Sequence, residues 1–70
     1  MTKSSKQLGL RIKGLRESKK WTQRECSEYI GLNHTYLASV ELGNRNVTLS
    51  NLEKIAEGFG ITLEELFRGL

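Results

Sequence analysis

Residues 33–46 read NHTYLASVELGNRN, and this stretch carries the signals of a short helix at both of its ends. The side-chain oxygen of Asn33 can accept a hydrogen bond from a backbone N–H of the first helical turn. Gly43 can end the helix in the left-handed conformation. Leu37 and Val40 are placed to face inward. The outward face is expected to be polar or small, and consists of His34, Thr35, Ala38 and Ser39.

A second predicted helix, residues 22–30, comes directly before this one. Thr22 and Glu25 fit a capping box, in which the threonine side chain bonds forward to a backbone N–H and the glutamate reaches back. Gly31 allows a tight turn between the two helices. Two short helices joined by such a turn form a helix-turn-helix motif, whose second helix enters the major groove of DNA.

Three further helices are predicted around this pair. One spans about residues 5–19, because apolar residues recur there at the i, i+4 and i+7 spacing of one helix face. Another spans about residues 49–59 and is capped by Thr48, and a last short helix follows a capping box at Thr62. The residues expected to face inward are Leu8, Ile12 and Leu15 in the first helix and Leu49, Leu52, Ile55, Ala56 and Phe59 in the next. The last helix carries Leu63, Leu66 and Phe67.

The chain of 70 residues contains no proline and no stretch with the alternation of a β-strand. We therefore predict an all-α fold, with one compact domain of five helices over residues 1–70 and a frayed segment at residues 1–5. Gly58 and Gly60 are expected to end the fourth helix. Trp21 is expected to anchor the core between the first two helices.

Charge is unevenly distributed along the chain. Residues 1–24 hold eight Lys and Arg against one Glu, a balance of +7, whereas residues 25–70 hold three Lys and Arg against seven Glu, a balance of −4. A basic region suits the phosphates of nucleic acid, although a solvated charged face is the plain alternative. The acidic part is expected to face away from DNA.

The composition leaves little room for catalysis. The single cysteine, Cys26, excludes an internal disulfide and a multi-cysteine metal site, and suits a small core residue. The single histidine, His34, has no second metal ligand at a helical spacing. The chain also has no aspartate and no glycine-rich phosphate motif, so we predict neither an enzyme nor a metal or cofactor site. No signal peptide or membrane span is visible, and we expect a bacterial or phage protein that works in the cytoplasm.

The order and spacing of these residues resemble the Cro/phage-repressor helix-turn-helix family from about Gln7 to Phe67. Within that family the chain most resembles the controller proteins of restriction–modification systems. The resemblance implies a five-helix, lambda-repressor-like domain that binds DNA and regulates transcription. It is carried by Leu8-Gly9, Arg11-Ile12, Leu15-Arg16, Trp21-Thr22-Gln23, Ile30-Gly31-Leu32, Thr35-Tyr36-Leu37, Val40-Glu41, Gly43-Asn44-Arg45-Asn46, Leu52, Ile55-Ala56 and Leu63-Glu64-Glu65-Leu66-Phe67.

The resemblance also implies roles for particular residues. Gln23 matches a family glutamine that contacts a phosphate and orients the recognition helix, and Arg16 and Glu41 match a pair that forms a mostly buried salt bridge. Two positions depart from the pattern. Controller proteins often carry arginine at the position of His34 and a basic residue at that of Leu42, so the operator sequence of relatives cannot be transferred to this chain. Predicted base contacts are His34, Thr35, Tyr36 and Ser39, and predicted phosphate contacts are Thr22, Gln23, Arg45, Asn46 and Thr48. The plain alternative for each is a solvated side chain or a turn residue.

The C-terminal helix carries more apolar residues than a short terminal helix readily buries. Either they all complete the core, or some form a contact between two copies of the chain, which we favour. The predicted dimer contact is made by Ile61, Leu63, Leu66 and Phe67. The function predicted is a homodimeric regulator on a pseudo-palindromic operator in double-stranded DNA, which would repress by occupying a promoter or activate by direct contact with RNA polymerase. The alternatives are a phage-type repressor and an antitoxin whose C-terminal helix binds a protein partner.

Overall fold

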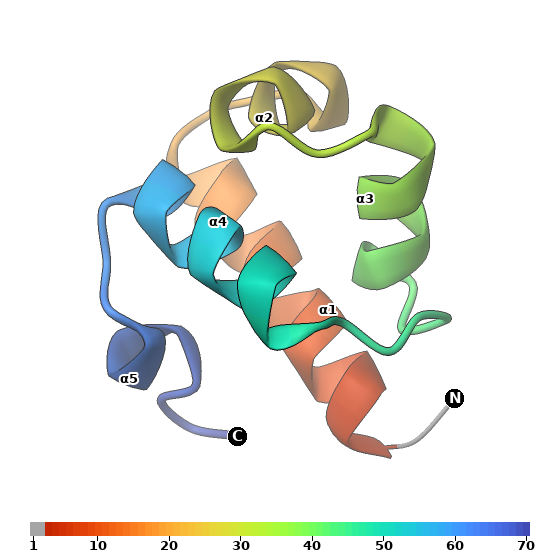
Figure 1. The fold of residues 1–70 in the computed structure, drawn as a ribbon, viewed down its shortest axis with the longest axis vertical. Helices are drawn as coiled ribbons and strands as arrows, with labels where there is room; N and C mark the ends of the chain where they lie inside the picture. The colour runs from red at the N-terminus through yellow and green to blue at the C-terminus, as the bar shows by residue number, and fades with distance from the viewer. Residues whose placement is uncertain (1–2) are drawn as a thin grey trace.

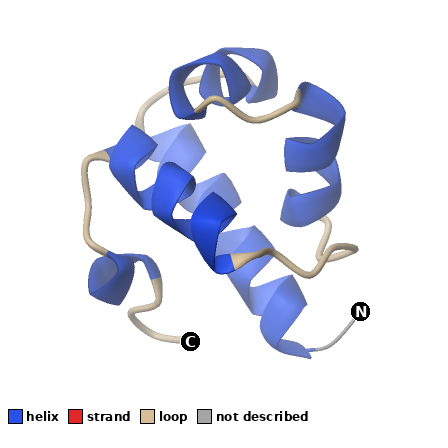
Figure 2. Cartoon of the chain, viewed as in Figure 1, coloured by secondary structure: helices blue, strands red, loops and turns tan. Residues whose placement is uncertain are grey.

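The computed structural model describes residues 3–70, which form five helices joined by short loops (Figure 1). Within that range everything outside the helices is turn or loop, as Figure 2 shows. The predicted all-α class and the predicted order of five helices are confirmed. The elements are α1 (Lys3–Ser18), α2 (Gln23–Ile30), α3 (His34–Glu41), α4 (Leu49–Phe59) and α5 (Leu63–Leu66).

α3 is held by two other helices, because both α1 and α2 pack against it. α2 also packs against α4, and α4 against α5, so that α3 and α5 lie on opposite sides of the domain (Figure 1). The domain measures 26 × 24 × 22 Å. None of the helices formed by residues 3–70 combines the length and the apolar character that a membrane crossing needs.

One apolar core receives side chains from all five helices. Leu37 and Val40 face inward as predicted, so α3 turns its apolar face to the core and its polar face away from it. Burial raises the pKa of the Cys26 thiol to about 11, which keeps the thiol protonated at neutral pH and agrees with its predicted place as a small core residue. The buried apolar residues are Ile12, Cys26, Ile30, Leu37, Val40, Ile55, Ala56, Phe59 and Leu66.

The predicted caps set the helix boundaries. Asn33 Oδ1 accepts hydrogen bonds from the backbone N–H groups of Thr35 at 2.8 Å and Tyr36 at 3.2 Å, which fixes the start of α3. Both capping boxes are formed, at the start of α2 and of α5. Gly43 lies at φ 79°, in the left-handed region that favours glycine, directly after the last residue of α3 and its cap. An N-terminal cap such as Asn33 contributes about 1 kcal/mol.

Three expectations about the fold are wrong. Leu49 is exposed, because the side chains of a helix lean toward its N-terminus and this residue opens α4, at the end of the apolar stripe. Gly58 lies inside α4 and does not end it, since the helix continues to Phe59 and reverses only at Gly60. Residues 3–5 belong to α1, whereas residues 1 and 2 of the predicted frayed segment lie outside the described residues.

Leu66 is also placed differently from the prediction, since it has no exposed surface and belongs to the core. The cause is a polar anchor on α1. The Arg11 guanidinium donates to the backbone oxygens of Glu65 at 2.8 Å and of Leu66 at 3.3 Å. These bonds hold the C-terminal end of α5 against the domain, and the negative end of a helix favours such a cation. Leu66 is therefore withdrawn from the predicted dimer contact.

Candidate nucleic-acid interface

The outward face of α3 is the centre of the candidate site. Thr35, Ser39 and Leu42 share this face, because they follow one another at the i, i+4 and i+7 spacing of a helix. Thr35 is exposed and Ser39 is half-buried, as is His34. The predicted orientation of α3 is confirmed. The predicted contacts of these side chains with bases remain a prediction.

Tyr36 is half-buried beside the loop that follows α3. Its hydroxyl accepts a hydrogen bond from Asn51 Nδ2 at 3.1 Å and keeps its own hydrogen for donation. The guanidinium carbon of Arg45 lies 5.6 Å from the centroid of the Tyr36 ring, within the range of a cation–π contact. Two predicted DNA contacts are thus brought together. Asn51 positions Tyr36 through its hydrogen bond to the hydroxyl. The sequence gives no local signal for this hydrogen bond, because fifteen residues separate Asn51 from Tyr36.

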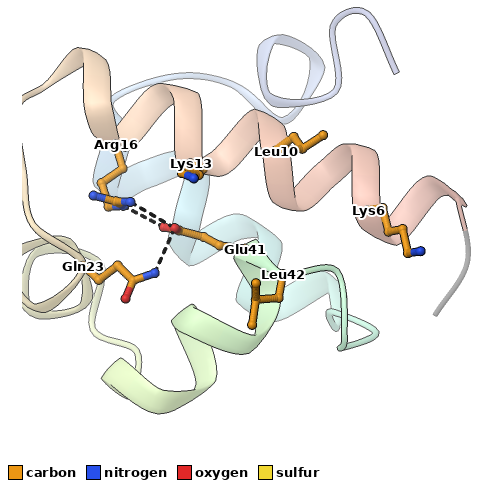
Figure 3. Close-up of a pocket in the computed structure, with 7 residues that line it drawn as sticks. All are labelled: Lys6, Leu10, Lys13, Arg16, Gln23, Glu41 and Leu42. Carbon is orange, nitrogen blue, oxygen red and sulfur yellow. Dashed lines mark hydrogen bonds and ion pairs between the residues drawn. The ribbon is translucent and has the colours of Figure 1, made fainter.

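The predicted pair of Arg16 and Glu41 is formed and ties α1 to the end of α3 (Figure 3). Arg16 Nε donates to Glu41 Oε2 at 2.8 Å and Nη2 donates to Oε1 at 3.1 Å. A third bond runs from Arg16 Nη1 to the backbone oxygen of Trp21 at 2.9 Å. Only 12% of the Arg16 side chain and 3% of the Glu41 side chain are exposed. The hydrogen bonds with Glu41 raise the pKa of Arg16 above its ordinary value.

Gln23 joins the same network from the start of α2. Its Nε2 donates to Glu41 Oε1 at 3.1 Å, so the amide is held against the C-terminal end of α3 (Figure 3). An amide nitrogen carries two hydrogens, and the second remains available to a phosphate. The first N–H groups of a helix have no partner within it and favour an anion. Gln23 therefore suits its predicted phosphate contact.

The other predicted phosphate contacts lie at the start of α2 and in the loop between α3 and α4. The hydroxyl oxygens of Thr22 and Thr48 accept cap bonds, from the N–H of Glu25 at 3.1 Å and of Asn51 at 3.2 Å. Each hydroxyl keeps its hydrogen and can still donate to an anion. Apart from Gln23, all predicted phosphate contacts are exposed, namely Thr22, Arg45, Asn46 and Thr48.

The predicted dimer residues are only partly available at the surface. Ile61 and Leu63 are half-buried and pack against the core, whereas Phe67 is 38% exposed and Leu70 is 47% exposed. Phe67 and Leu70 line a groove of about 510 Å³ together with Leu8, Val47, Arg45, Asn46, Ser4 and Ser5. The exposed apolar residues near the C-terminus therefore lie beside the loop that carries two predicted phosphate contacts. Within residues 3–70 no group of three or more His, Cys, Asp or Glu side chains is placed to hold a metal ion.

A helix with an exposed polar face, preceded by a short helix and a tight turn on a five-helix scaffold, defines a helix-turn-helix DNA-binding domain. The profile of the helix-turn-helix family matches residues 12–66, and this chain belongs to that family.

Relatives and solved structures agree with this assignment. The chain is similar to the control protein C.MunI of Mycoplasma sp, with 50% identity over 60 residues that cover 84% of this chain and 81% of C.MunI. Its fold is similar to that of the restriction–modification controller protein C.AhdI of Aeromonas hydrophila, with a TM-score of 0.86, 36% identity and coverage of 90% and 96% of the two chains. The fold is also similar to that of C.Esp1396I in a nucleoprotein complex, with a TM-score of 0.85, 27% identity and coverage of 96% of this chain and 87% of C.Esp1396I. The predicted resemblance, to the family and to controller proteins, is confirmed.

Proposed function

We propose that this protein regulates transcription by binding double-stranded DNA in a sequence-specific way as a homodimer. α3 would lie in the major groove, where its exposed side chains contact base edges. Donors at the start of α2 and in the loop after α3 would bind phosphates and position the helix. The half-sites of a pseudo-palindromic operator would then lie about one helical turn, roughly 34 Å, apart.

The observation that carries this proposal is the division of α3 into two faces. Leu37 and Val40 are buried and fix the helix, whereas Thr35 is exposed and points away from the core. The major groove is about 12 Å wide and admits one α-helix. A helix anchored by one face and open along the other suits that groove.

More narrowly, we propose a controller protein of a restriction–modification system. This assignment is supported by the similarity to C.MunI and C.AhdI, two proteins that are named as controllers. Such a protein would act in the bacterial cytoplasm, where the DNA lies. A neighbouring pair of genes for an endonuclease and a methyltransferase would agree with this role, and a neighbouring toxin gene would contradict it.

The proposed dimer rests on the exposure of Phe67 and Leu70. Large apolar side chains that remain exposed next to one another on a small domain favour an interface. The domain is at most 26 Å long, so two copies side by side can place their α3 helices at the half-site spacing of about 34 Å. A symmetric contact through this surface would also join the loops that carry Arg45 and Asn46 to the interface.

Protein partners other than a second copy are less well supported. Activation by direct contact with RNA polymerase would use the exposed glutamates on α4 and α5, namely Glu53, Glu57 and Glu64. The antitoxin alternative needs apolar surface on the C-terminal helix. The burial of Leu66 removes an apolar residue from that surface and weakens this alternative.

Replacing Thr35 by alanine should relax the sequence preference of the protein. The side chain is exposed on the face of α3 that we place in the groove, and a net hydrogen bond of this kind contributes about 1 kcal/mol. Selection of bound duplexes from a random pool, with wild type and variant in parallel, should show the loss at one position of each half-site.

Asn46→Ala is the matched control, because Asn46 is also polar and exposed but lies in the loop where we place phosphate contacts. It should weaken binding to all duplexes about equally. A Thr35→Ala variant that selects the same sites as wild type would remove Thr35 from the base contacts. A wild-type protein that selects no sites at all would contradict the proposed function.

Replacing Phe67 by glutamate should give monomers, because a carboxylate would have to be buried in the proposed contact. We expect the dimer dissociation constant to rise at least about tenfold, equal to about 1.4 kcal/mol. Sedimentation at several concentrations measures it. The control is Tyr29→Glu, at an exposed aromatic residue on α2 outside the proposed contact. An unchanged dimer in Phe67→Glu would refute the contact.

A further inference from the structure

A groove between α1 and the end of α3 is lined mostly by residues outside the proposed contacts, with Gln23 as the exception. It has a volume of about 430 Å³ and is lined by Lys6, Leu10, Lys13, Arg16, Gln23, Glu41 and Leu42. Figure 3 shows Lys6, Leu10 and Lys13 spread along α1, with Glu41 and Leu42 at the end of α3 across from them. We infer that this groove binds the sugar–phosphate backbone of one DNA strand, with Lys6 and Lys13 contacting phosphates. This inference rests on the proposed function, since it extends the same DNA interface onto α1.

The charge of the groove favours an anion. Arg16 and Glu41 neutralise each other in their ion pair, so the two lysines give the groove its net positive charge. Both lysines are exposed, and neither forms an ion pair within residues 3–70. They are seven residues apart, about 10.5 Å along a helix, so they can contact different phosphates of one strand.

The backbone holds Lys6 beside the end of α3. A Cβ added at Gly43 would lie 2.7 Å from both the Cα and the Cγ of Lys6, which shows how closely the two segments pack. Gly43 directly follows Leu42 and has the left-handed conformation, with φ 79°. The stem of Lys6 is thus placed against the turn that ends α3, on the side of the groove.

The apolar part of the groove suits deoxyribose. Leu10 is 67% exposed and Leu42 is 70% exposed, and they reach the same groove from two different helices. Two leucines that are this exposed can both contact a ligand in the groove. The C–H groups of the sugars between phosphates provide apolar surface for that contact. On α1, Leu10 lies between Lys6 and Lys13, and this order matches a strand in which a sugar separates two phosphates.

The groove is continuous with the interface already described. Gln23 lines it and is also the predicted phosphate contact at the start of α2. Leu42 lines it and shares the outward face of α3 with Thr35 and Ser39. A duplex that lies against that face therefore passes the opening of the groove. The basic N-terminal region then has a direct role in binding, beyond the general attraction of positive charge for DNA.

The test is the salt dependence of DNA binding by the double variant Lys6→Ala/Lys13→Ala. The affinity is measured at several salt concentrations for a duplex selected by the wild-type protein and for an unrelated duplex. Each lost phosphate contact makes the dependence of log affinity on log salt less steep by about 0.9, and the variant dimer loses two contacts per subunit, so we expect a slope less steep by about 3.6 on both duplexes. Sequence preference should stay unchanged, because phosphates carry no sequence information.

The matched control is Lys54→Ala/Arg68→Ala, which removes the same charge from exposed positions outside the groove. It should keep the wild-type slope. Leu42→Lys adds one cation to the groove of each subunit and should make the slope of the dimer steeper by about 1.8, which tests the site by a gain of binding. Circular dichroism checks that each variant is folded.

The outcomes separate this inference from the proposed function. A wild-type protein that binds both duplexes equally overturns the proposed function and the inference together. A wild-type protein that prefers the selected duplex, with an unchanged slope in Lys6→Ala/Lys13→Ala and in Leu42→Lys, overturns the inference alone. Equal slopes in the groove variant and in the Lys54→Ala/Arg68→Ala control would also overturn it, because they would assign the effect to net charge.

Discussion

Replacing Glu41 by alanine should remove a large share of the stability of the protein. Arg16 would keep a guanidinium that is only 12% exposed and would lose both carboxylate contacts. Removing one partner of a buried pair typically costs about 3–5 kcal/mol, against a total stability of about 5–15 kcal/mol for a small domain. Gln23 would lose its partner as well, so the start of α2 would come free from the end of α3.

Urea unfolding followed by Trp21 fluorescence measures this loss, with the protein concentration held fixed because dimerisation would contribute to stability. Glu53→Ala is the control, at an exposed glutamate on α4, and should change stability by less than about 0.5 kcal/mol. The double variant Arg16→Met/Glu41→Leu should recover a large part of the loss, since it leaves no unpaired buried charge. If Glu41→Ala is as stable as Glu53→Ala, the pair does not hold the helices together.

Local signals explain why so much of the fold could be predicted. Asn33, Thr22 and Thr62 cap helices through bonds that span two or three residues, so their sequence context contains the whole interaction. Apolar periodicity placed Leu37 and Val40 correctly for the same reason. The Arg16–Glu41 pair spans 25 residues and was predicted only through the family resemblance, which carries three-dimensional information that spacing does not.

The wrong and the missed predictions have one physical cause, which is that burial depends on packing against elements far away in the sequence. Leu49 and Leu66 are both apolar helix residues, yet one is exposed and the other fully buried, because only Leu66 lies under another element. The groove on α1 was missed because its walls come from helices far apart in the sequence. Its one local signal is the i, i+4 and i+7 spacing of Lys6, Leu10 and Lys13, on the face of α1 that the apolar stripe leaves free. Which base each α3 side chain contacts depends on the docked duplex and has no signal in the chain.

Two glycines of α1 should respond to alanine in opposite directions. Gly9 is buried at the point where α1 and α3 meet, and a Cβ there would collide with the backbone oxygen of Val40 and lie 2.6 Å from that of Glu41. Gly14 is exposed and has nothing within 4 Å of the same position. Alanine in a helix is favoured over glycine by about 1 kcal/mol, so Gly14→Ala should stabilise the protein by about that amount.

Gly9→Ala should instead destabilise it by about 3 kcal/mol, the upper end of the usual cost of overpacking, because backbone carbonyls cannot rotate out of the way as a side chain can. The collision lies on the last residues of α3, so the variant should also displace that helix and weaken DNA binding, whereas Gly14→Ala should leave binding unchanged. Urea unfolding of both variants at one concentration measures the difference, about 4 kcal/mol when the gain and the loss are combined. Since the two substitutions are chemically identical and lie on one helix, a pair of variants with equal stability would mean that α1 and α3 do not approach as closely as the structure has them. The position of the recognition helix would then depend on α2 alone, and the groove beside Lys6 would lose one of its walls.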